Sequence, residues 1–378
     1  MNAMSEGTER VQTLVIGGGQ AGLAAGYHLG KRGLPFVILD AEERIGDNWR
    51  HRWDSLRLFT PAHSDSLPGM PFPGPRFAFP SGREFGDYLE AYATRFQLPV
   101  RSGIRVDGVR PLDRGGQGFA VTAGNRRFEA KQVVVATGAF QRPNVPAFAN
   151  ELDPAITQLH SSAYRRPSQL RAGRVLVVGV SHSGADIAFE VARSHATVLS
   201  GKAHGQIPVP LESLRCRVTW PFIVFLASHV ATLRTPVGRK MAPKVRNGGG
   251  PLLRVRRDDL KNAGVEWFES KVVGVRDGRP VLADGQVLDV ANVVWCTGYR
   301  PDYSWIDPPV AGEDGWPTQD RGVSRTPGLY FLGIPFLYAF TSMNVTGAGR
   351  DAKYVVDRIA ARAKATAGAR PMESAAAA

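Results

Sequence analysis

Cysteine is scarce in this chain of 378 residues: only Cys216 and Cys296 occur, and they lie far apart. Two distant cysteines do not make the dense disulfide framework of a small secreted protein. The chain also has no Cys-x-x-Cys pair, which is the motif that thioredoxin-reductase-like enzymes use to relay electrons. The sequence therefore excludes an enzyme that relays electrons through a Cys-x-x-Cys dithiol.

Acidic residues are missing from one long stretch. None occurs between Glu212 and Asp258, whereas ten basic residues do, and the whole chain carries a net charge of +13. This stretch contains no recognised nucleic-acid-binding module, and aromatic residues are not interleaved with the basic ones, so no nucleic acid is expected as a partner. We expect a solvated basic face that also attracts an anionic cofactor.

Apolar runs of membrane-spanning length are lacking as well. The apolar segment 218–233 is too short to cross a bilayer. We expect a helical insertion that lines the substrate entrance or a homodimer contact. A helix that makes peripheral membrane contact is the less favoured alternative. The polar start of the chain, MNAMSEGTER, has no signal-peptide pattern, so a cytoplasmic location is expected.

The length favours two or more domains, and the apolar and charged fractions, 43% and 21%, are typical of globular proteins. Apolar residues predict a strand over 12–18, a helix over 20–32 and a second strand over 35–40. These are the parts of one βαβ unit. The same order returns between residues 174 and 200, which indicates an internal duplication of nucleotide-binding units.

The first unit carries the fingerprint Gly17-x-Gly19-x-x-Gly22, with Asp40 at the end of its second strand. Gly17 allows the tight turn, Gly19 lets the backbone approach a pyrophosphate, and Gly22 permits close packing of helix on strand. The helix N-terminus offers free N–H groups to the anion, and Asp40 is placed to accept hydrogen bonds from a ribose. This combination predicts a dinucleotide site.

The second unit has Gly179-x-Ser181-x-Ser183-Gly184, with serine where the middle glycine is usual. Ser181 adds bulk near the phosphates, although its hydroxyl could donate to them. Its second strand ends at Ser200-Gly-Lys202, with no acid at the place of Asp40. Lysine and serine favour a 2′-phosphate, so NADPH is expected rather than NADH; the alternative is a merely solvated lysine.

Two further strands end in a small residue followed by Thr-Gly: Ala136-Thr137-Gly138 and Cys296-Thr297-Gly298. Such a strand can turn away while its backbone closes over a bound cofactor. Each alone is only a strand-to-loop turn, but the pair is more informative at this spacing.

The chain resembles the class B flavin-dependent monooxygenases, and within them the flavoproteins related to the CzcO and plant YUCCA groups. The resemblance covers roughly residues 10–360. It rests on an ordered set of segments: GGGQAGLAAG, IGDNWRHRWDSLRLF, VVVATGAF, HSSAY, VVGVSHSGADIA, WCTGYRPD and GLYFLG. The combination is specific, whereas no single segment would be.

The resemblance implies FAD at the first turn, with Gly46 and Trp49 closing over the isoalloxazine side, and NADPH at the second. In such enzymes hydride passes from NADPH to the flavin, which then reacts with O₂ to form a C4a-hydroperoxide that oxygenates a small nucleophilic or apolar substrate. The cofactor carries this chemistry, while the protein orients it and excludes water.

The chain departs from the family pattern at two places. Of the FxGxxxH linker fingerprint only His160 and the later aromatic Tyr164 remain, because Pro154 and Ile156 replace the Phe and Gly. Tyrosine in place of tryptophan argues against a Baeyer–Villiger enzyme, and His160 is either an interdomain hinge residue or an ordinary buried histidine. Phe59 replaces an asparagine of many relatives and cannot hydrogen-bond the oxygenated flavin; it either shortens the life of that species or simply packs beneath the ring.

We predict an α/β fold with two doubly wound, Rossmann-like, three-layer domains. The FAD-binding domain is expected to be discontinuous, at 1–155 and 288–378, and the NADPH-binding domain, at 156–287, to carry a helical and basic insertion near 210–257. The leading hypothesis is an NADPH-dependent FAD monooxygenase. The alternatives are an NADPH oxidase or reductase that releases peroxide, and a redox-sensing accessory of a membrane transporter.

The candidate residues follow from these motifs, and no metal site is expected. The candidates for the reaction are Phe59, His160 and Tyr164. The candidates for cofactor binding are Gly17, Gly19, Gln20, Ala21, Gly22, Asp40, Gly46, Asn48, Trp49, Ala136, Thr137, Gly138, Gly179, Ser181, His182, Ser183, Gly184, Ser200, Lys202, Cys296, Thr297 and Gly298.

Overall fold

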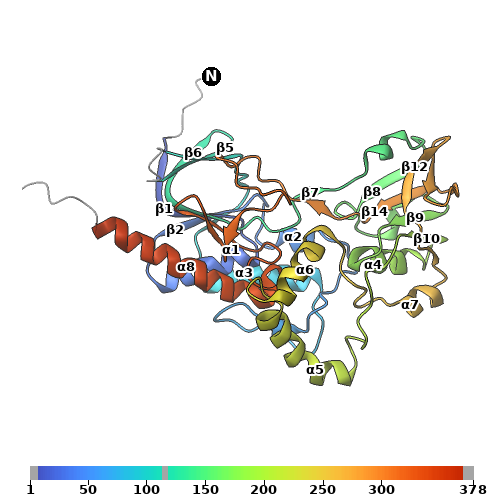
Figure 1. The fold of residues 1–378 in the computed structure, drawn as a ribbon, viewed down its shortest axis with the longest axis horizontal. Helices are drawn as coiled ribbons and strands as arrows, with labels where there is room; N and C mark the ends of the chain where they lie inside the picture. Colours follow the sequence, from blue (N-terminus) through green and yellow to red (C-terminus); the bar gives the residue numbers. More distant parts are fainter. Residues whose placement is uncertain (1–6, 113–117, 369–378) are drawn as a thin grey trace, which may run out of the picture.

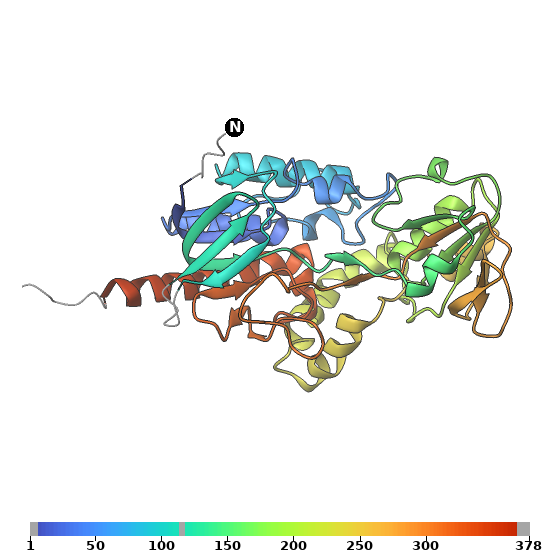
Figure 2. The same ribbon diagram turned by 90° about the horizontal axis from the view of Figure 1, so that it is seen from above.

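The computed structural model describes residues 7–112 and 118–368, which form two lobes, each built on its own β-sheet (Figures 1 and 2). The sheet of the first lobe has the order β16-β17-β18-β6-β1-β2-β3, and β5 and β4 extend from β6 as an antiparallel layer. Its strands are β1 (Glu9–Ile16), β2 (Phe36–Leu39), β3 (Val100–Arg101), β4 (Gly108–Pro111), β5 (Phe119–Ala123), β6 (Arg126–Val135), β16 (Gln319–Asp320), β17 (Val323–Ser324) and β18 (Leu329–Phe331).

The second lobe holds a parallel sheet of five strands in the order β11-β10-β9-β14-β8. These strands are β8 (Thr157–His160), β9 (Val175–Val178), β10 (Thr197–Ser200), β11 (Glu266–Phe268) and β14 (Asn292–Trp295). An antiparallel pair, β12 (Val272–Arg276) and β13 (Arg279–Leu282), lies in the same lobe (Figure 1).

The described α-helices are α1 (Gln20–Lys31), α2 (Asp47–Arg50), α3 (Gly82–Arg95), α4 (His182–Val191), α5 (Leu214–Phe225), α6 (Pro236–Asn247), α7 (Arg257–Asn262) and α8 (Val345–Gly368). All four residues of β9 and of β14 are buried, as is typical of parallel strands that helices and loops cover on both faces. Helices α1 and α8 pack together against the first sheet, and α4 packs on β9 and β10. The predicted α/β class with two doubly wound domains is confirmed.

Two predicted domain limits need correction. Residues 292–295 form β14, which lies between β9 and β8, so the chain leaves the second lobe only after Trp295 and not at 288. The second lobe also begins before 156, because Ala149 and Leu152 pack in the same core cluster as Trp295. An apolar strand signals burial, but it does not say which of two sheets the strand will join.

The basic insertion forms helices as predicted, but they pack on the first lobe. Helices α5 and α6 come from the chain of the second lobe, yet the turn between them pairs with the C-terminal part of the first. The N–H of Leu233 donates to Tyr338 O at 2.9 Å, and the N–H of Phe340 donates to Ala231 O at 2.9 Å. In Figure 1, α6 lies between the lobes and α5 at the lower edge of the molecule. The insertion therefore bridges the two lobes.

Two chain crossings join the lobes. They run antiparallel as β7 (Arg142–Pro143) and β15 (Tyr299–Arg300), which pair with each other. A third link is Trp53, a residue of the first lobe whose indole is 6% exposed and packs in the core cluster of the second lobe with Tyr164 and Ile187. Beside it, the N–H of Asp54 donates to Arg165 O at 2.8 Å. These contacts fix the mutual orientation of the lobes.

Trp53→Ala should lower the free energy of unfolding by about 3–5 kcal/mol, because it removes a buried indole and leaves a cavity between the lobes. Urea unfolding followed by circular dichroism measures the change. The control is Val273→Ala, at a side chain that is 55% exposed, which should change stability by less than about 0.5 kcal/mol. A loss below about 1 kcal/mol in Trp53→Ala would contradict the interlobe role of this indole.

Candidate functional site

The first glycine turn joins β1 to α1 by direct contact between backbone segments. Gly17 has φ +109°, and a Cβ there would lie 2.5 Å from Ala136 O at the end of β6. A Cβ on Gly22 would lie 1.9 Å from Gly17 O, so helix and strand can meet only without it. Ala21 is buried beside Gly333, whose Cβ would lie 3.0 Å from it. The N-terminus of α1 thus opens at the carboxyl edge of the sheet, where anions bind.

Asp40 stands at the end of β2, over the first turn. A Cβ on Gly18 would lie 2.5 Å from Asp40 Oδ2, which places the carboxylate directly beside the turn. The N–H of Glu42 donates to Asp40 Oδ1 at 3.4 Å. Burial raises the pKa of the Asp40 carboxyl above its usual value. The side chain is therefore held beside the turn, and its role as a ribose acceptor stays a prediction.

Helix α2 covers the open side of this turn. Trp49 Nε1 donates to Gln20 Oε1 at 3.3 Å, which ties α2 to the start of α1. Asn48 Nδ2 would lie 3.5 Å from a Cβ on Gly19. Gly46 precedes α2 with φ +90°, a backbone conformation that glycine adopts without strain. The structure therefore brings these five predicted residues together at one turn.

The second turn repeats the geometry of the first. Gly179 has φ +106°, and its Cβ would lie 2.4 Å from Cys296 O at the end of β14. A Cβ on Gly184 would lie 1.8 Å from Gly179 O. Ser183 lies in the first turn of α4, beside this contact. Burial raises the pKa of the Cys296 thiol well above its usual value, so the sulfur stays a protonated packing group.

The two Thr-Gly turns lie where the chain crosses between lobes. Gly138 and Gly298 have similar positive φ values, 73° and 79°, and a Cβ on either would meet no atom within 4 Å. The N–H of Asn144 donates to Gly298 O at 3.0 Å, and Asn144 Nδ2 donates to Thr297 O at 3.1 Å. Thr137 Oγ1 accepts from Gln141 Nε2 at 3.0 Å. The two turns thus share one backbone conformation, and each is hydrogen-bonded to the crossing segment that contains Gln141 and Asn144.

At the second turn, residues from three segments meet. The ring of His182, the first residue of α4, lies 5.3 Å from the ring of Phe59 of the first lobe. Gly250 lies so close to His182 that a Cβ would be 2.6 Å from Nε2, and a Cβ on Gly249 would be 3.1 Å from Ser181 Cβ. His182 Nε2 is shielded from solvent. Burial lowers the pKa of His182 to about 4, so the ring is neutral near pH 7.

The two residues proposed for a 2′-phosphate have different surroundings. Ser200 is 1% exposed, and its hydroxyl donates to Ser270 O at 2.8 Å, so it does not face a ligand. This corrects the prediction for Ser200. Lys202 is exposed just beyond the end of β10, and its role toward a 2′-phosphate stays a prediction.

His160 serves as a tie between strands. It ends β8, where it is paired in register with Trp295. The N–H of Ser162 donates to His160 Nδ1 at 3.1 Å, and Nε2 donates to Gly298 O at 3.0 Å. The neutral ring therefore has a hydrogen bond at each of its two nitrogens, and burial lowers the pKa of the imidazole. These contacts leave neither ring nitrogen for the reaction, and they fit both the hinge residue and the ordinary buried histidine.

Tyr164 is a core residue. Its side chain is fully buried among the apolar residues of the second lobe, and its hydroxyl donates to Glu190 Oε2 at 2.7 Å. Burial and the bond to Glu190 raise the pKa of the phenol. We therefore correct the prediction that Tyr164 takes part in the reaction and assign it to packing beside Trp53.

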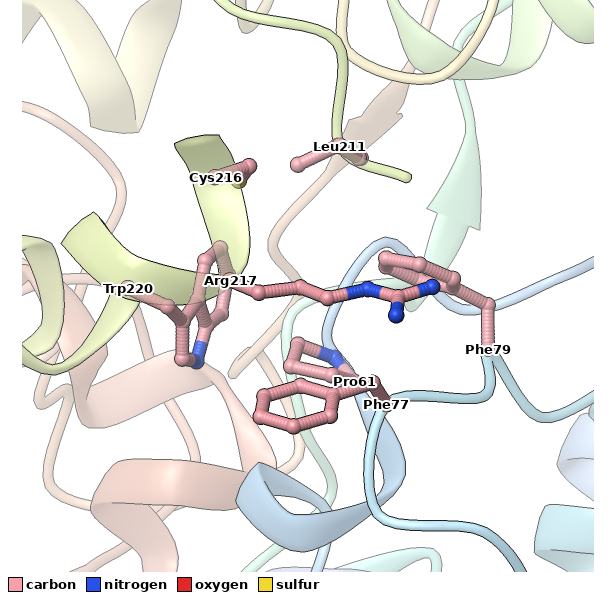
Figure 3. A pocket seen from close by; sticks show the side chains of 7 residues that line it. All are labelled: Pro61, Phe77, Phe79, Leu211, Cys216, Arg217 and Trp220. Carbon is pink, nitrogen blue, oxygen red and sulfur yellow. The ribbon is translucent and has the colours of Figure 1, made fainter. Parts of the chain in front are cut away.

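A small pocket lies between α5 and the loop that follows Phe59 (Figure 3). Its enclosed cavity is about 10 Å³, room for about one water molecule. The Arg217 guanidinium lies 5.5 Å from the centre of the Phe77 ring, and Figure 3 shows the arginine extended across the pocket toward Phe79. The lining residues are Pro61, Phe77, Phe79, Leu211, Cys216, Arg217 and Trp220. The cavity is far smaller than an ordinary ligand pocket, and its walls are aromatic with one cation.

Sequence reasoning missed this pocket and the contact of Gly249 and Gly250 with the second turn. Three consecutive glycines at 248–250 were a usable signal, because such a run allows the backbone to pass close to another segment. The pocket had no comparable signal, since its two walls lie more than a hundred residues apart in sequence.

Neither a metal-ligand cluster nor a membrane-spanning helix occurs in residues 7–112 and 118–368. Within these ranges no cluster of three or more His, Cys, Asp or Glu side chains could hold a metal ion. In the same part of the chain, no helix combines the length and apolar character needed to span a membrane.

Comparison with known proteins relates both turns to one family. The family model described as pyridine nucleotide-disulphide oxidoreductase matches residues 14–208. The CzcO-like oxidoreductase of Geobacillus kaustophilus is 38% identical over 350 residues, which are 92% of this chain and 98% of that protein. The probable indole-3-pyruvate monooxygenase YUCCA1 of Arabidopsis thaliana is 27% identical over 92% of this chain and 89% of its own length.

A solved structure agrees with this assignment. The flavin-containing monooxygenase from Stenotrophomonas maltophilia superposes with a TM-score of 0.72 at 30% sequence identity, over 94% of this chain and all of that one. The chain therefore belongs to the pyridine nucleotide-disulphide oxidoreductase family and is a flavin-dependent oxidoreductase related to the CzcO, YUCCA and flavin-containing monooxygenase proteins.

Proposed function

We propose that the protein is an NADPH-dependent FAD monooxygenase that transfers one oxygen atom to a small nucleophilic or apolar substrate. In the balanced reaction, substrate, O₂, NADPH and a proton give oxygenated substrate, water and NADP⁺. The observation that carries the proposal is the repeated glycine cradle, with Gly17 against Ala136 O and Gly179 against Cys296 O.

The first cradle fits FAD. Its glycines leave no room for a Cβ at the turn, the start of α1 offers free N–H groups, and Asp40 lies beside the turn as a ribose acceptor. Bound flavin would supply hydride acceptance and oxygen activation. The protein residues would hold the cofactor, with Trp49 and α2 covering it on one side.

The second cradle fits NADPH. No carboxylate stands at the end of β10, and Lys202 is exposed there, so a 2′-phosphate would meet a cation. His182 begins α4 at this turn, and its shielded ring packs against Gly250. Phe59 packs against the same histidine and brings the loop of the first lobe to this turn.

The residues that line the pocket of Figure 3 would contact the substrate, for which the small enclosed space would have to widen. The pocket begins at Pro61, two residues after Phe59, and its walls are mostly apolar. Aromatic walls exclude water from the reacting atoms, and Arg217 would orient an anionic group of the substrate by charge.

A peroxide-releasing NADPH oxidase is the second candidate. It is favoured by Phe59, because a phenyl ring next to the second turn donates no hydrogen bond to bound oxygen. The two functions differ in the fate of O₂, so the products distinguish them.

A methyl group added to the glycine of each cradle should impair the binding of a different cofactor. Gly17→Ala should yield protein without flavin, because the new Cβ collides with Ala136 O. Gly179→Ala collides in the same way with Cys296 O, but it should keep flavin and lose reduction by NADPH at least tenfold. Flavin absorbance of the purified proteins and anaerobic stopped-flow reduction measure both. If Gly179→Ala lost its flavin while Gly17→Ala kept it, the assignment of FAD to the first cradle and NADPH to the second would be contradicted.

Lys202→Glu should lower kcat/KM for NADPH by about tenfold or more, because a charge-assisted bond to the 2′-phosphate becomes a repulsion. The value for NADH should stay within about twofold. Lys261→Glu, at an exposed lysine of the same lobe, is the matched control and should leave both values unchanged. If kcat/KM fell equally for NADPH and NADH, Lys202 would not be the residue that binds the 2′-phosphate.

Oxygen transfer itself is tested with a soft nucleophile, thioanisole, under ¹⁸O₂. The monooxygenase proposal expects labelled sulfoxide and a fall in peroxide formed per NADPH consumed. Phe59→Asn, which adds an amide beside His182, should lower the peroxide yield further. Peroxide equal to NADPH in both proteins, without labelled product, would decide for the oxidase.

A further inference from the structure

Helix α5 presents an apolar stripe to solvent. Leu214, Val218 and Phe222 are 73%, 73% and 63% exposed, and Phe225 and Leu226 extend the stripe at 53% and 37%. Spacings of three and four residues place these side chains on one side of the helix. We call these five residues the α5 face. Figure 1 shows α5 at the lower edge of the molecule, away from both sheets.

The opposite side of α5 is firmly attached to the first lobe. Cys216 is 4% exposed and lines the pocket of Figure 3. Trp220 Nε1 donates to Ser64 Oγ at 2.7 Å, and Ser213 caps the helix by accepting from the N–H of Cys216. The first part of the helix is therefore held in place by this side, and the apolar stripe lies on the other side.

Cations are frequent on α5 and on the segment that follows it. Arg215 and Arg217 lie on α5 itself, and Arg234, Arg239 and Lys240 are exposed on the turn and helix that follow. No acidic residue occurs in the sequence between Glu212 and Asp258. In the described part of the chain, the ion pairs of residues 213–257 are those of Arg246 and Arg257, so none of the five cations above has an acidic partner. Three of them contact the protein in other ways: Arg217 lies over Phe77, Arg234 lies over Tyr338, and Arg239 donates to Leu233 O and Arg234 O.

We propose that the α5 face docks on an anionic lipid surface, with α5 lying in the plane of the interface. Apolar side chains together with arginine and lysine on the same segment match the two components of such a surface, acyl chains and anionic headgroups. Twelve residues of helix span about 18 Å, too short to cross a bilayer, so the contact is peripheral. This surface is separate from the two nucleotide cradles, and the inference does not rest on the proposed function.

A second copy of the chain fits the α5 face less well. In a symmetric dimer the same patch meets itself, so the cations of both copies would face each other with no acid from residues 213–257 to balance them. An anionic surface removes this repulsion.

The test is co-sedimentation of the purified full chain with two kinds of vesicle, pure phosphatidylcholine and phosphatidylcholine with phosphatidylserine. The protein should bind the anionic vesicles, with weaker binding at high salt. Val218→Glu/Phe222→Glu should weaken binding at least tenfold. The matched control is Leu112→Glu/Val273→Glu, which changes the charge equally at exposed apolar residues elsewhere and should bind like the wild type.

Circular dichroism of each variant checks that the fold is kept, and the vesicle assay needs no bound cofactor. The proposal is overturned if the wild type stays in the supernatant with both vesicles, or if both variants bind equally. It is also overturned if the wild type is a dimer in solution that Val218→Glu/Phe222→Glu converts to monomer, because the occupant would then be a second copy.

Discussion

Close contact between backbone segments at the two glycine turns is the constraint on which the rest of the structure depends. At each turn a helix begins where a strand ends, and the carbonyl of a neighbouring strand lies within 2.5 Å of the place of a Cβ. Only glycine permits this approach, and it opens the helix N-terminus toward a pyrophosphate. The repetition of the same contacts in both lobes explains how one chain offers two nucleotide sites.

The proposed hydride transfer between two nucleotides also requires that the lobes keep their orientation. The paired strands β7 and β15, the His160 bond to Gly298 O and the insertion of Trp53 into the second core all act on that orientation. Helices α5 and α6 add a further bridge, because they leave the second lobe and pack on the first. The residues near the crossings are thus explained by positioning rather than by proton transfer, which fits chemistry carried by the cofactors.

Much of this was predictable from sequence because the constraint is local. The spacing of Gly17, Gly19 and Gly22 and the buried strands around them determine the turn within about 30 residues. What failed depended on distant packing. The sheet that β14 joins, the inward hydroxyl of Ser200 and the buried place of Tyr164 are set by segments far away in sequence. The pocket beside α5 was missed for the same reason.

Anaerobic titration of the purified, flavin-containing protein with NADPH tests the central claim most directly. If the two cradles hold FAD and NADPH with their reactive rings in contact, one NADPH per flavin should bleach the visible flavin absorbance completely. Protein that retains flavin but keeps its absorbance unchanged at saturating NADPH would contradict the account.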